Sequence, residues 1–183
     1  ALAALCKEIS GATTTLTSVP KPLKFLHPHY KALVAAYDER EDGDSKRAFA
    51  DVLSVLSVVA AKPEERAALS YKLQGNPAEL EAWGHEYLRH VAGEVGDEYD
   101  ARVTAEPPRD VDELEQLVDV IVPFHFHHHS ESEAVDLLLE VASLDKVLSV
   151  DTLDSRNVQR ASQYMLRCAD YIDDPDDRAQ IMD

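Results

Sequence analysis

The chain has 183 residues, of which 18 are Lys or Arg and 35 are Asp or Glu, so its formal net charge is −17. A charge of this sign and size repels the phosphate backbone of nucleic acids and the anionic surface of membranes, which argues against both as partners. With 45% hydrophobic and 29% charged residues, the composition is that of a folded protein and excludes a mostly disordered tail. The acidity is typical of a solvated surface, and the alternative is a docking face for a basic partner.

The two cysteines, Cys6 and Cys168, lie far apart in apolar helical contexts and form no framework of regularly spaced pairs. We therefore expect two reduced, buried thiols in a protein of the cytoplasm and nucleus. The longest apolar run, residues 52–61, is interrupted by serines and too short to span a bilayer. Because the sequence starts without Met inside an apparent helix and ends without a tail, we expect residues 1–183 to be a single helical domain that is a fragment of a longer chain.

Apolar residues at helical spacing predict a first helix over residues 2–10. Residues 13–28 are predicted to be a connector without a continuous helix, because they are rich in β-branched residues and contain Pro20, Pro22 and Pro28. Seven further helices are predicted from apolar residues that recur every three or four positions: 29–39, 46–61, 63–73, 78–103, 111–122, 131–141 and 152–172.

Three of these helices carry additional predictions. Helix 46–61 has apolar residues on one stripe with serines interleaved, so it is expected to be buried over more than half its circumference. Helix 78–103 is the longest and contains Gly84 and Gly93, each of which costs about 1 kcal/mol relative to alanine. That cost predicts the close approach of a neighbouring helix, or a kink. Pro123 is predicted to end helix 111–122.

Eight or nine amphipathic helices joined by short polar loops, without a strand signal, predict an all-α fold. We expect an irregular, solenoid-like array of antiparallel helical hairpins, because no fixed repeat period is recognisable. Six residues are predicted to hold the core together: Trp83, Tyr87, Val91, Phe49, Leu53 and Leu56.

The segment HEYLRH, from His85 to His90, resembles the zinc-protease signature HExxH but has three residues between Glu86 and His90. Five helical positions span about 500°, so the two imidazoles point about 140° apart and do not share a metal as an i, i+4 pair does. We predict no zinc site here and expect one of the two histidines to be partly packed and the other solvated.

The second metal candidate is PFHFHHHSESE, in which imidazoles and carboxylates lie close together in sequence. Its candidate ligands are His125, His127, His128, His129, Glu131 and Glu133. A dedicated site draws ligands from separate elements that fix its geometry, and a turn after a proline does not provide this. We predict a solvated turn between helices, with adventitious metal binding as the alternative.

No serine or cysteine lies in a GxSxG elbow, and no glycine-rich phosphate loop is present in the sequence. A dyad of Cys6 with one of the eight histidines is conceivable, but buried thiols are favoured. We therefore predict no catalytic, cofactor-binding or metal-binding residue, no cofactor, and no enzymatic activity.

Five segments and their order carry a resemblance to a known family: SVPKPLKFLHPHY (18–30), KRAFADVLSVLSV (46–58), YKLQG (71–75), WGHEYLRHVAGEV (83–95) and EAVDLLLEV (133–141). They resemble the N-terminal region of the non-ATPase regulatory subunit 2 family of the 26S proteasome, the large scaffold subunits of the regulatory-particle base. YMLRCADYI (164–172) continues the resemblance. The sequence departs from the family pattern at residues 41–45, at residues 103–110, and at His125, His127 and His129. The departure at the histidines weakens the idea that metal binding by this cluster is a property of the family.

The resemblance implies a non-catalytic subunit that supports ubiquitin-dependent degradation by organising protein partners. These are the proteasomal ATPases, together with ubiquitin, ubiquitin-like proteins and a deubiquitinase bound through a repeat toroid outside this sequence, so no binding residue is carried over. The alternatives are a helical adaptor unrelated to the proteasome and a metal-dependent hydrolase that uses the histidines. Two observations distinguish these three hypotheses: which proteins co-purify with the chain, and whether the chain binds zinc stoichiometrically.

Overall fold

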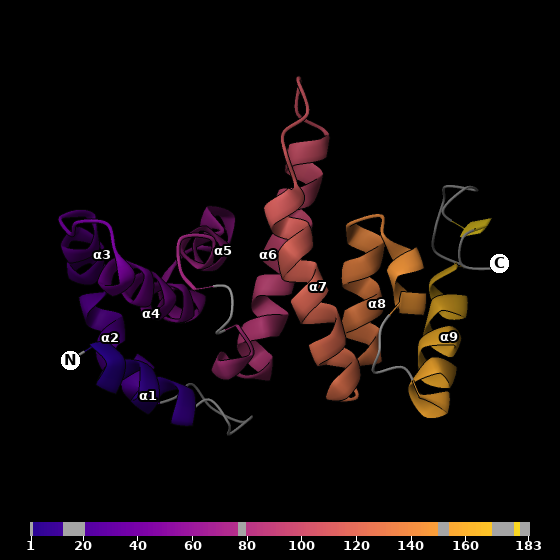
Figure 1. Ribbon diagram of the computed structural model, residues 1–183, viewed down its shortest axis with the longest axis horizontal. Helices are drawn as coiled ribbons and strands as arrows, with labels where there is room; N and C mark the ends of the chain where they lie inside the picture. Colours follow the sequence, from indigo (N-terminus) through magenta and orange to yellow (C-terminus); the bar gives the residue numbers. More distant parts are fainter. Residues whose placement is uncertain (1, 13–20, 77–79, 150–153, 170–177, 180–183) are drawn as a thin grey trace. The chain divides into compact units, whose positions relative to one another are not determined.

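The computed structural model describes residues 2–12, 21–76, 80–149, 154–169 and 178–179 (Figure 1). Within these residues the regular secondary structure is entirely helical, and the predicted all-α fold is confirmed, with nine α-helices and several 3-10 turns. The chain divides into two compact units, residues 1–94 and 95–183. The expectation that residues 1–183 form a single domain stays a prediction.

The first unit contains the following elements: α1 (Leu2–Ala12), α2 (Lys21–Leu26), η1 (His27–His29), α3 (Tyr30–Asp38), α4 (Asp44–Ala60), η2 (Pro63–Glu65), α5 (Ala67–Lys72) and η4 (Glu81–Trp83). Helix α6 (His85–Val103) begins in the first unit and ends in the second. The second unit continues with α7 (Asp112–His127), α8 (Glu131–Glu140), η5 (Leu144–Ser149) and α9 (Ser155–Ala169).

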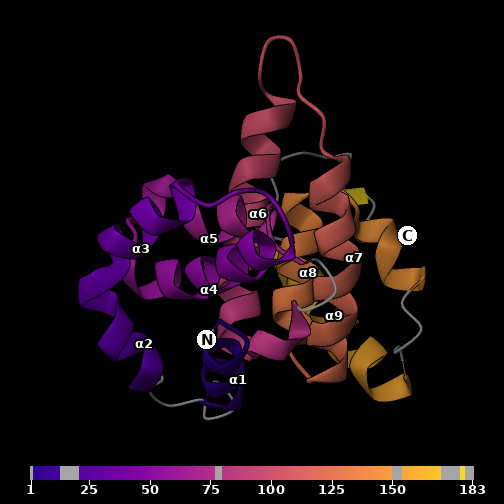
Figure 2. The same ribbon diagram turned by 60° about the vertical axis from the view of Figure 1, so that its left-hand side comes forward.

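Helix α4 is the centre of the first unit, and α1, α2, α3 and α5 all pack against it (Figures 1 and 2). Every residue from 49 to 57 is buried, so the prediction that this helix is covered on most of its circumference is confirmed. The six predicted core residues are also buried, with exposures of 4% or less: Trp83, Tyr87, Val91, Phe49, Leu53 and Leu56. Each large side chain buried here stabilises the fold by about 1.5–3 kcal/mol relative to leaving it exposed.

The predicted connector is wrong for residues 21–28, which form α2 and most of η1. Pro22 is the second residue of α2 and Pro28 the second residue of η1. Proline is tolerated in a first turn because the N–H that it lacks has no intrahelical partner there. Residues 13–20 lie outside the described residues.

Two residues with positive φ interrupt helices that were predicted to be continuous. Arg66, with φ 44°, divides the predicted helix 63–73 into η2 and α5. Gly84, with φ 86°, separates η4 from α6, so the predicted start of helix 78–103 is wrong, although α6 is the longest helix described, at 19 residues. Only glycine adopts the conformation of Gly84 without strain, and this explains its presence better than helix contact does.

The predicted close approach at Gly93 is also wrong, because a Cβ placed there has no atom of a neighbouring element within 4 Å. The close approach occurs at Gly96 instead, where a Cβ would lie 2.0 Å from Oε2 of Glu140 on α8. Both glycines are helical, and the sequence pattern alone did not distinguish the exposed position from the covered one.

In the second unit α7 packs against α8, and α8 packs against α9 (Figure 1). Helix α7 continues through Pro123 to His127, so the prediction that this proline ends the helix is wrong. An interior proline removes one backbone hydrogen bond at a cost of about 3 kcal/mol. Burial of Ile121, Val122 and Phe124 on either side of Pro123 offsets that cost.

Candidate functional site

His85 and His90, the pair from the HEYLRH segment, both lie on α6 and are both half-buried. Nε2 of His90 lies 3.0 Å from Oε1 of Glu94 one turn further along the helix. Glu94 also makes a buried contact, in which its Oε2 accepts a hydrogen bond of 2.7 Å from the backbone N–H of Leu69. Glu94 therefore links this part of α6 to α5.

The solvated turn that the sequence predicted for the histidine-rich segment is shorter than expected, because α7 includes His125 and His127 and only residues 128–130 connect α7 to α8. His125 is completely buried, since α7 extends past Pro123 and turns this side chain into the core of the second unit. His127, His128 and His129 are exposed, and the ring of His128 lies 4.1 Å from that of Phe124. Among the described residues, no three His, Cys, Asp or Glu side chains are gathered so as to hold a metal ion.

The two thiols are half-buried, so the expectation of fully buried cysteines is wrong for both Cys6 and Cys168. No disulfide joins the two. Partial burial raises the pKa of the Cys168 thiol, and a hydrogen bond with Tyr164 opposes that rise. A thiol with a raised pKa is a poorer nucleophile at neutral pH than an ordinary one.

A buried ion pair in the first unit joins Asp51 on α4 to Lys72 on α5. Nζ of Lys72 lies 2.9 Å from Oδ1 of Asp51, and both residues are 1% exposed. The ammonium also donates to the backbone carbonyl of Asn76 at 2.6 Å, and the N–H of Asn76 donates to both carboxylate oxygens. A Cβ at Gly75 would lie 2.2 Å from Oδ1 of Asp51, so the backbone approaches this carboxylate as closely as a glycine permits.

A second buried chain of hydrogen bonds runs from α4 to α6. Oγ of Ser54 donates to the carbonyl of Ala68 at 2.5 Å and shares a hydrogen bond of 2.6 Å with the hydroxyl of Tyr87. Burial raises the pKa of Tyr87 well above its ordinary value, so the hydroxyl keeps its proton. Together with the hydrogen bond from Leu69 to Glu94, these contacts link α4, α5 and α6 through buried polar groups.

A shallow groove of about 370 Å³ lies between α3 and α5 in the first unit, with Tyr30 and Tyr71 among its lining residues. Burial is the largest of the causes that raise the pKa of Tyr30 to about 12. The neighbouring Tyr71 adds to this rise through its charge and through a hydrogen bond. The ring of Tyr71 also meets that of Tyr37 edge to face at 5.5 Å, and Tyr37 in turn meets Phe49 at 5.9 Å. Polar and charged side chains line the groove beside the two tyrosines, among them Lys31, Glu65 and Ser70.

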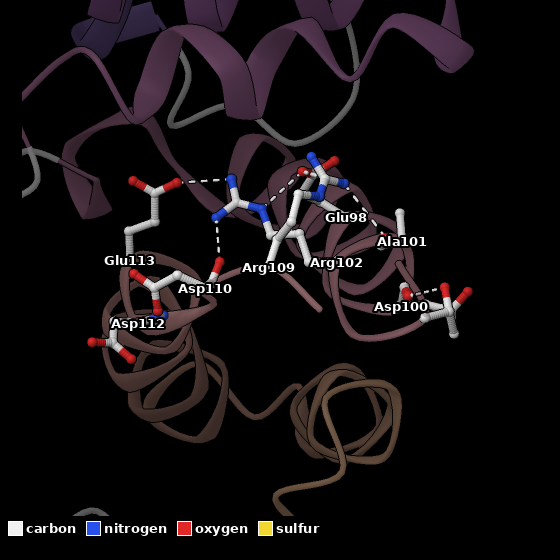
Figure 3. A network of polar contacts seen from close by, with 9 residues as sticks. Glu98, Asp100, Ala101, Arg102, Arg109, Asp110, Asp112 and Glu113 are labelled. Atoms are coloured by element: carbon white, nitrogen blue, oxygen red, sulfur yellow. Dashed lines mark hydrogen bonds and ion pairs between the residues drawn. The ribbon is translucent and has the colours of Figure 1, made fainter. Parts of the chain in front are cut away.

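The junction of α6 and α7 is held by arginines at the surface of the second unit (Figure 3). Arg102 donates to Oε1 of Glu98 at 2.8 Å, to the carbonyl of Asp110 at 2.9 Å and to Oε1 of Glu113 at 2.7 Å. The hydrogen bond to Glu98 is the largest contribution that raises the pKa of Arg102. The N–H of Arg109 donates to the carbonyl of Arg102 at 2.9 Å, and these contacts set the path of residues 104–111 between the two helices.

Helices α8 and α9 are joined by two polar contacts. Arg160 of α9 donates to Glu131 at the start of α8, and the hydroxyl of Tyr164 donates to Asp136 at 2.6 Å. Burial alone raises the pKa of Glu131, but the hydrogen bond and charge of Arg160 outweigh it and hold that pKa below its ordinary value. Glu131 was predicted as a possible metal ligand, and the structure shows it as an ion-pair partner instead.

The fold and these sites define a class of protein: an all-α array whose buried polar groups connect helices to one another. The family comparison agrees with the sequence resemblance. The model described as "RPN1 N-terminal domain" matches residues 1–183. The chain belongs to this family.

Curated relatives cover nearly the whole chain. It is 45% identical over 177 residues to "26S proteasome non-ATPase regulatory subunit 2" of Dictyostelium discoideum, which covers 97% of this chain and 19% of the relative. Homolog A of the same subunit in Arabidopsis thaliana is 42% identical with the same coverage. "26S proteasome regulatory subunit rpn1" of Schizosaccharomyces pombe is 39% identical over 98% of this chain and 20% of its own length. The chain therefore spans about a fifth of the length of these relatives.

None of the helices in the described part of the chain is both long enough and apolar enough to cross a membrane.

Proposed function

We propose that this chain is the N-terminal helical segment of a non-catalytic scaffold subunit in the base of the 26S proteasome regulatory particle. The observation that carries the proposal is the family match over residues 1–183, together with relatives named as regulatory subunits of the 26S proteasome that are 39–45% identical over 97–98% of the chain. In this proposal residues 1–183 act as a single domain of a longer subunit in the cytoplasm and nucleus.

The role that the structure supports is geometric. A helical array buries its apolar stripes between neighbouring helices and leaves lateral surfaces for protein contacts. The buried Asp51–Lys72 and Ser54–Tyr87 contacts link the helices of the first unit to one another, as a scaffold requires. The full-length subunit would organise the ATPase ring, and it would receive ubiquitin, ubiquitin-like proteins and a deubiquitinase through regions outside this sequence.

The first test is affinity purification of the full-length parent protein from its own cells, without nickel resin, followed by mass spectrometry of the co-eluting proteins. Recovery of the six proteasomal ATPases with the core particle is the expected result. Their absence from a preparation in which intact proteasomes survive would instead favour a helical adaptor unrelated to the proteasome. Zinc retained in stoichiometric amount after chelation would favour the metal-dependent hydrolase.

A pair of matched variants tests whether this segment takes part in the scaffold. Leu53 is fully buried on α4, and Val103 at the end of α6 is 47% exposed. Leu53→Asp places an unpaired charge in the core, and we expect its full-length form to be lost from the proteasome fraction. Val103→Asp makes the same chemical change at the surface and is expected to be retained. Equal incorporation of the two variants would mean that this segment is not needed for assembly.

A further inference from the structure

Residues 9–37 form a stretch without carboxylates in an otherwise acidic chain. They contain no Asp or Glu, although the whole chain has 35 of these residues. Three lysines and two histidines fall within the same stretch. In a chain of net charge −17, this segment is therefore a local region of positive charge, and helix α2 lies within it.

Helix α2, with the sequence KPLKFL, presents two lysines and an exposed phenylalanine on the same side. Phe25 is 76% exposed, more than any other large hydrophobic residue in the described part of the chain. At about 100° per residue, Lys21, Lys24 and Phe25 fall within an arc of about 100° around the helix, and all three are exposed. Leu23, which is buried, lies about 160° from both Lys21 and Phe25. We call the three exposed residues the α2 patch.

The two lysines of the α2 patch are unpaired within the described part of the chain, where no hydrogen bond or ion pair involves either ammonium group. Besides η1, which contains no carboxylate, helices α1 and α4 pack against α2. Of the two carboxylates on α4, Asp44 pairs with Arg47, and Asp51 is buried in its own ion pair. The one carboxylate of α1 is Glu8. The two lysines therefore meet at most one unpaired carboxylate from the helices that pack against α2.

We propose that the α2 patch is a docking surface for an acidic segment of a partner protein, one in which an apolar side chain lies among the carboxylates. Phe25 forms the apolar centre of this surface, since aromatic side chains are enriched at the cores of protein interfaces. Lys21 and Lys24 form a charged rim, and their complementarity to carboxylates sets the orientation and the rate of encounter more than the affinity. The inference goes beyond the proposed scaffold function and does not depend on it, because it uses the surface of α2 alone.

An acidic segment of a protein fits the α2 patch better than a nucleic acid or an anionic membrane does. Each of those two carries an extended array of negative charge, which a chain of net charge −17 repels over most of its surface. A short acidic segment meets only the patch and its two lysines. A single exposed apolar side chain is ordinary on a protein surface, and the specific feature here is that Phe25 lies beside two unpaired lysines. An acidic segment with an apolar side chain uses both features.

The test is site-specific photo-crosslinking in the full-length protein in its own cells. Benzoylphenylalanine replaces Phe25 in one strain and Val103, a 47% exposed residue at the end of α6, in a control strain. We expect the Phe25 probe to give one dominant cross-linked peptide from another protein, with net negative charge and an apolar residue at the cross-link or next to it. Reversing both charges, Lys21→Glu with Lys24→Glu, should lower its yield about fivefold, the loss expected for two exposed ion pairs. The matched double variant, Lys21→Arg with Lys24→Arg, retains both charges and should retain the yield.

Four outcomes would overturn the proposal. The first is a cross-link within the same polypeptide or to a second copy of it, and the second is a cross-linked peptide that is basic or has no apolar residue at the link. The third is a yield no higher than that of the Val103 probe, and the fourth is a yield that charge reversal leaves unchanged. If the proteasomal ATPases co-purify in every strain, these failures concern the α2 patch alone and leave the proposed scaffold function standing. If the ATPases are absent from every strain while the Phe25 probe captures an acidic partner, the scaffold function fails and the α2 patch stands.

Discussion

The buried ion pair between Asp51 and Lys72 provides the sharpest test of how the first unit is held together. Each residue is 1% exposed, and the two charged atoms are 2.9 Å apart. We consider three variants: Lys72→Met, Asp51→Asn and the two combined. Met has nearly the volume of Lys without its charge, and Asn keeps an oxygen that accepts the N–H of Asn76.

Each single variant leaves one buried charge without its partner, which costs about 3–5 kcal/mol of unfolding free energy. The double variant leaves no buried charge. Its cost should therefore be smaller than that of either single variant, so that it falls well short of the sum of the two single costs. With a urea dependence of about 2 kcal/mol per molar, the single variants should lower the midpoint of unfolding by about 2 M.

Urea unfolding can be followed by the fluorescence of Trp83, since it is the only tryptophan of the chain and is buried in the same unit. The matched control is Arg47→Met, which breaks a pair with Asp44 whose side chains are 62% and 101% exposed. That change should cost at most about 1 kcal/mol. Single costs below about 1 kcal/mol for the buried pair, or a double variant equal to their sum, would refute the reasoning.

Three further predictions concern single positions. Gly93→Ala should raise the unfolding free energy by about 0.5–1 kcal/mol in thermal or urea unfolding, because its Cβ meets no neighbouring element and alanine favours the helix; destabilisation would mean that α6 is covered there. Glu131→Gln should destabilise at pH 7, and this destabilisation should shrink as the pH is lowered. The pKa of Glu131 is lowered by Arg160, so its contribution is present above the ordinary carboxyl pKa of about 4.3 and is lost as the pH falls through the lowered value; a pH-independent effect would contradict this. Trp83→Ala should cost about 3–5 kcal/mol, and unchanged thermal stability would refute the placement of Trp83 in the core.

The sequence predicted the helices well where apolar periodicity was long and uninterrupted. Helices α3, α4 and α8 lie where residues 29–39, 46–61 and 131–141 were predicted, with ends that differ by at most two residues. Apart from the break at Arg66, the errors in the helix prediction fall at glycine and proline, whose effect depends on their position within a turn. Pro22 and Pro28 lie in first turns, where proline is tolerated, and Pro123 lies where burial offsets its cost.

The buried polar contacts were not predicted, for a different reason. Asp51 and Lys72 are 21 positions apart, and their pairing depends on how α4 and α5 pack. One signal was available, since Asp51 stands inside a helix predicted to be buried on most sides, where a charge requires a partner. The identity of that partner was not available from periodicity.

The burial of these polar groups also matters for the kind of function that the segment can have. A catalytic site leaves a reactive group accessible, whereas the carboxylate of Asp51 and the hydroxyl of Tyr87 are buried and bonded to residues of other segments. We expect the Asp51–Lys72 pair to contribute more to conformational specificity than to stability, because the desolvation of the two charges offsets much of their attraction. Replacing Asp51 and Lys72 together should therefore impair incorporation into a larger assembly more than it impairs folding. Comparing the unfolding free energy of the double variant with its yield in the proteasome fraction tests this directly, and normal incorporation of a destabilised double variant would assign the pair to stability alone.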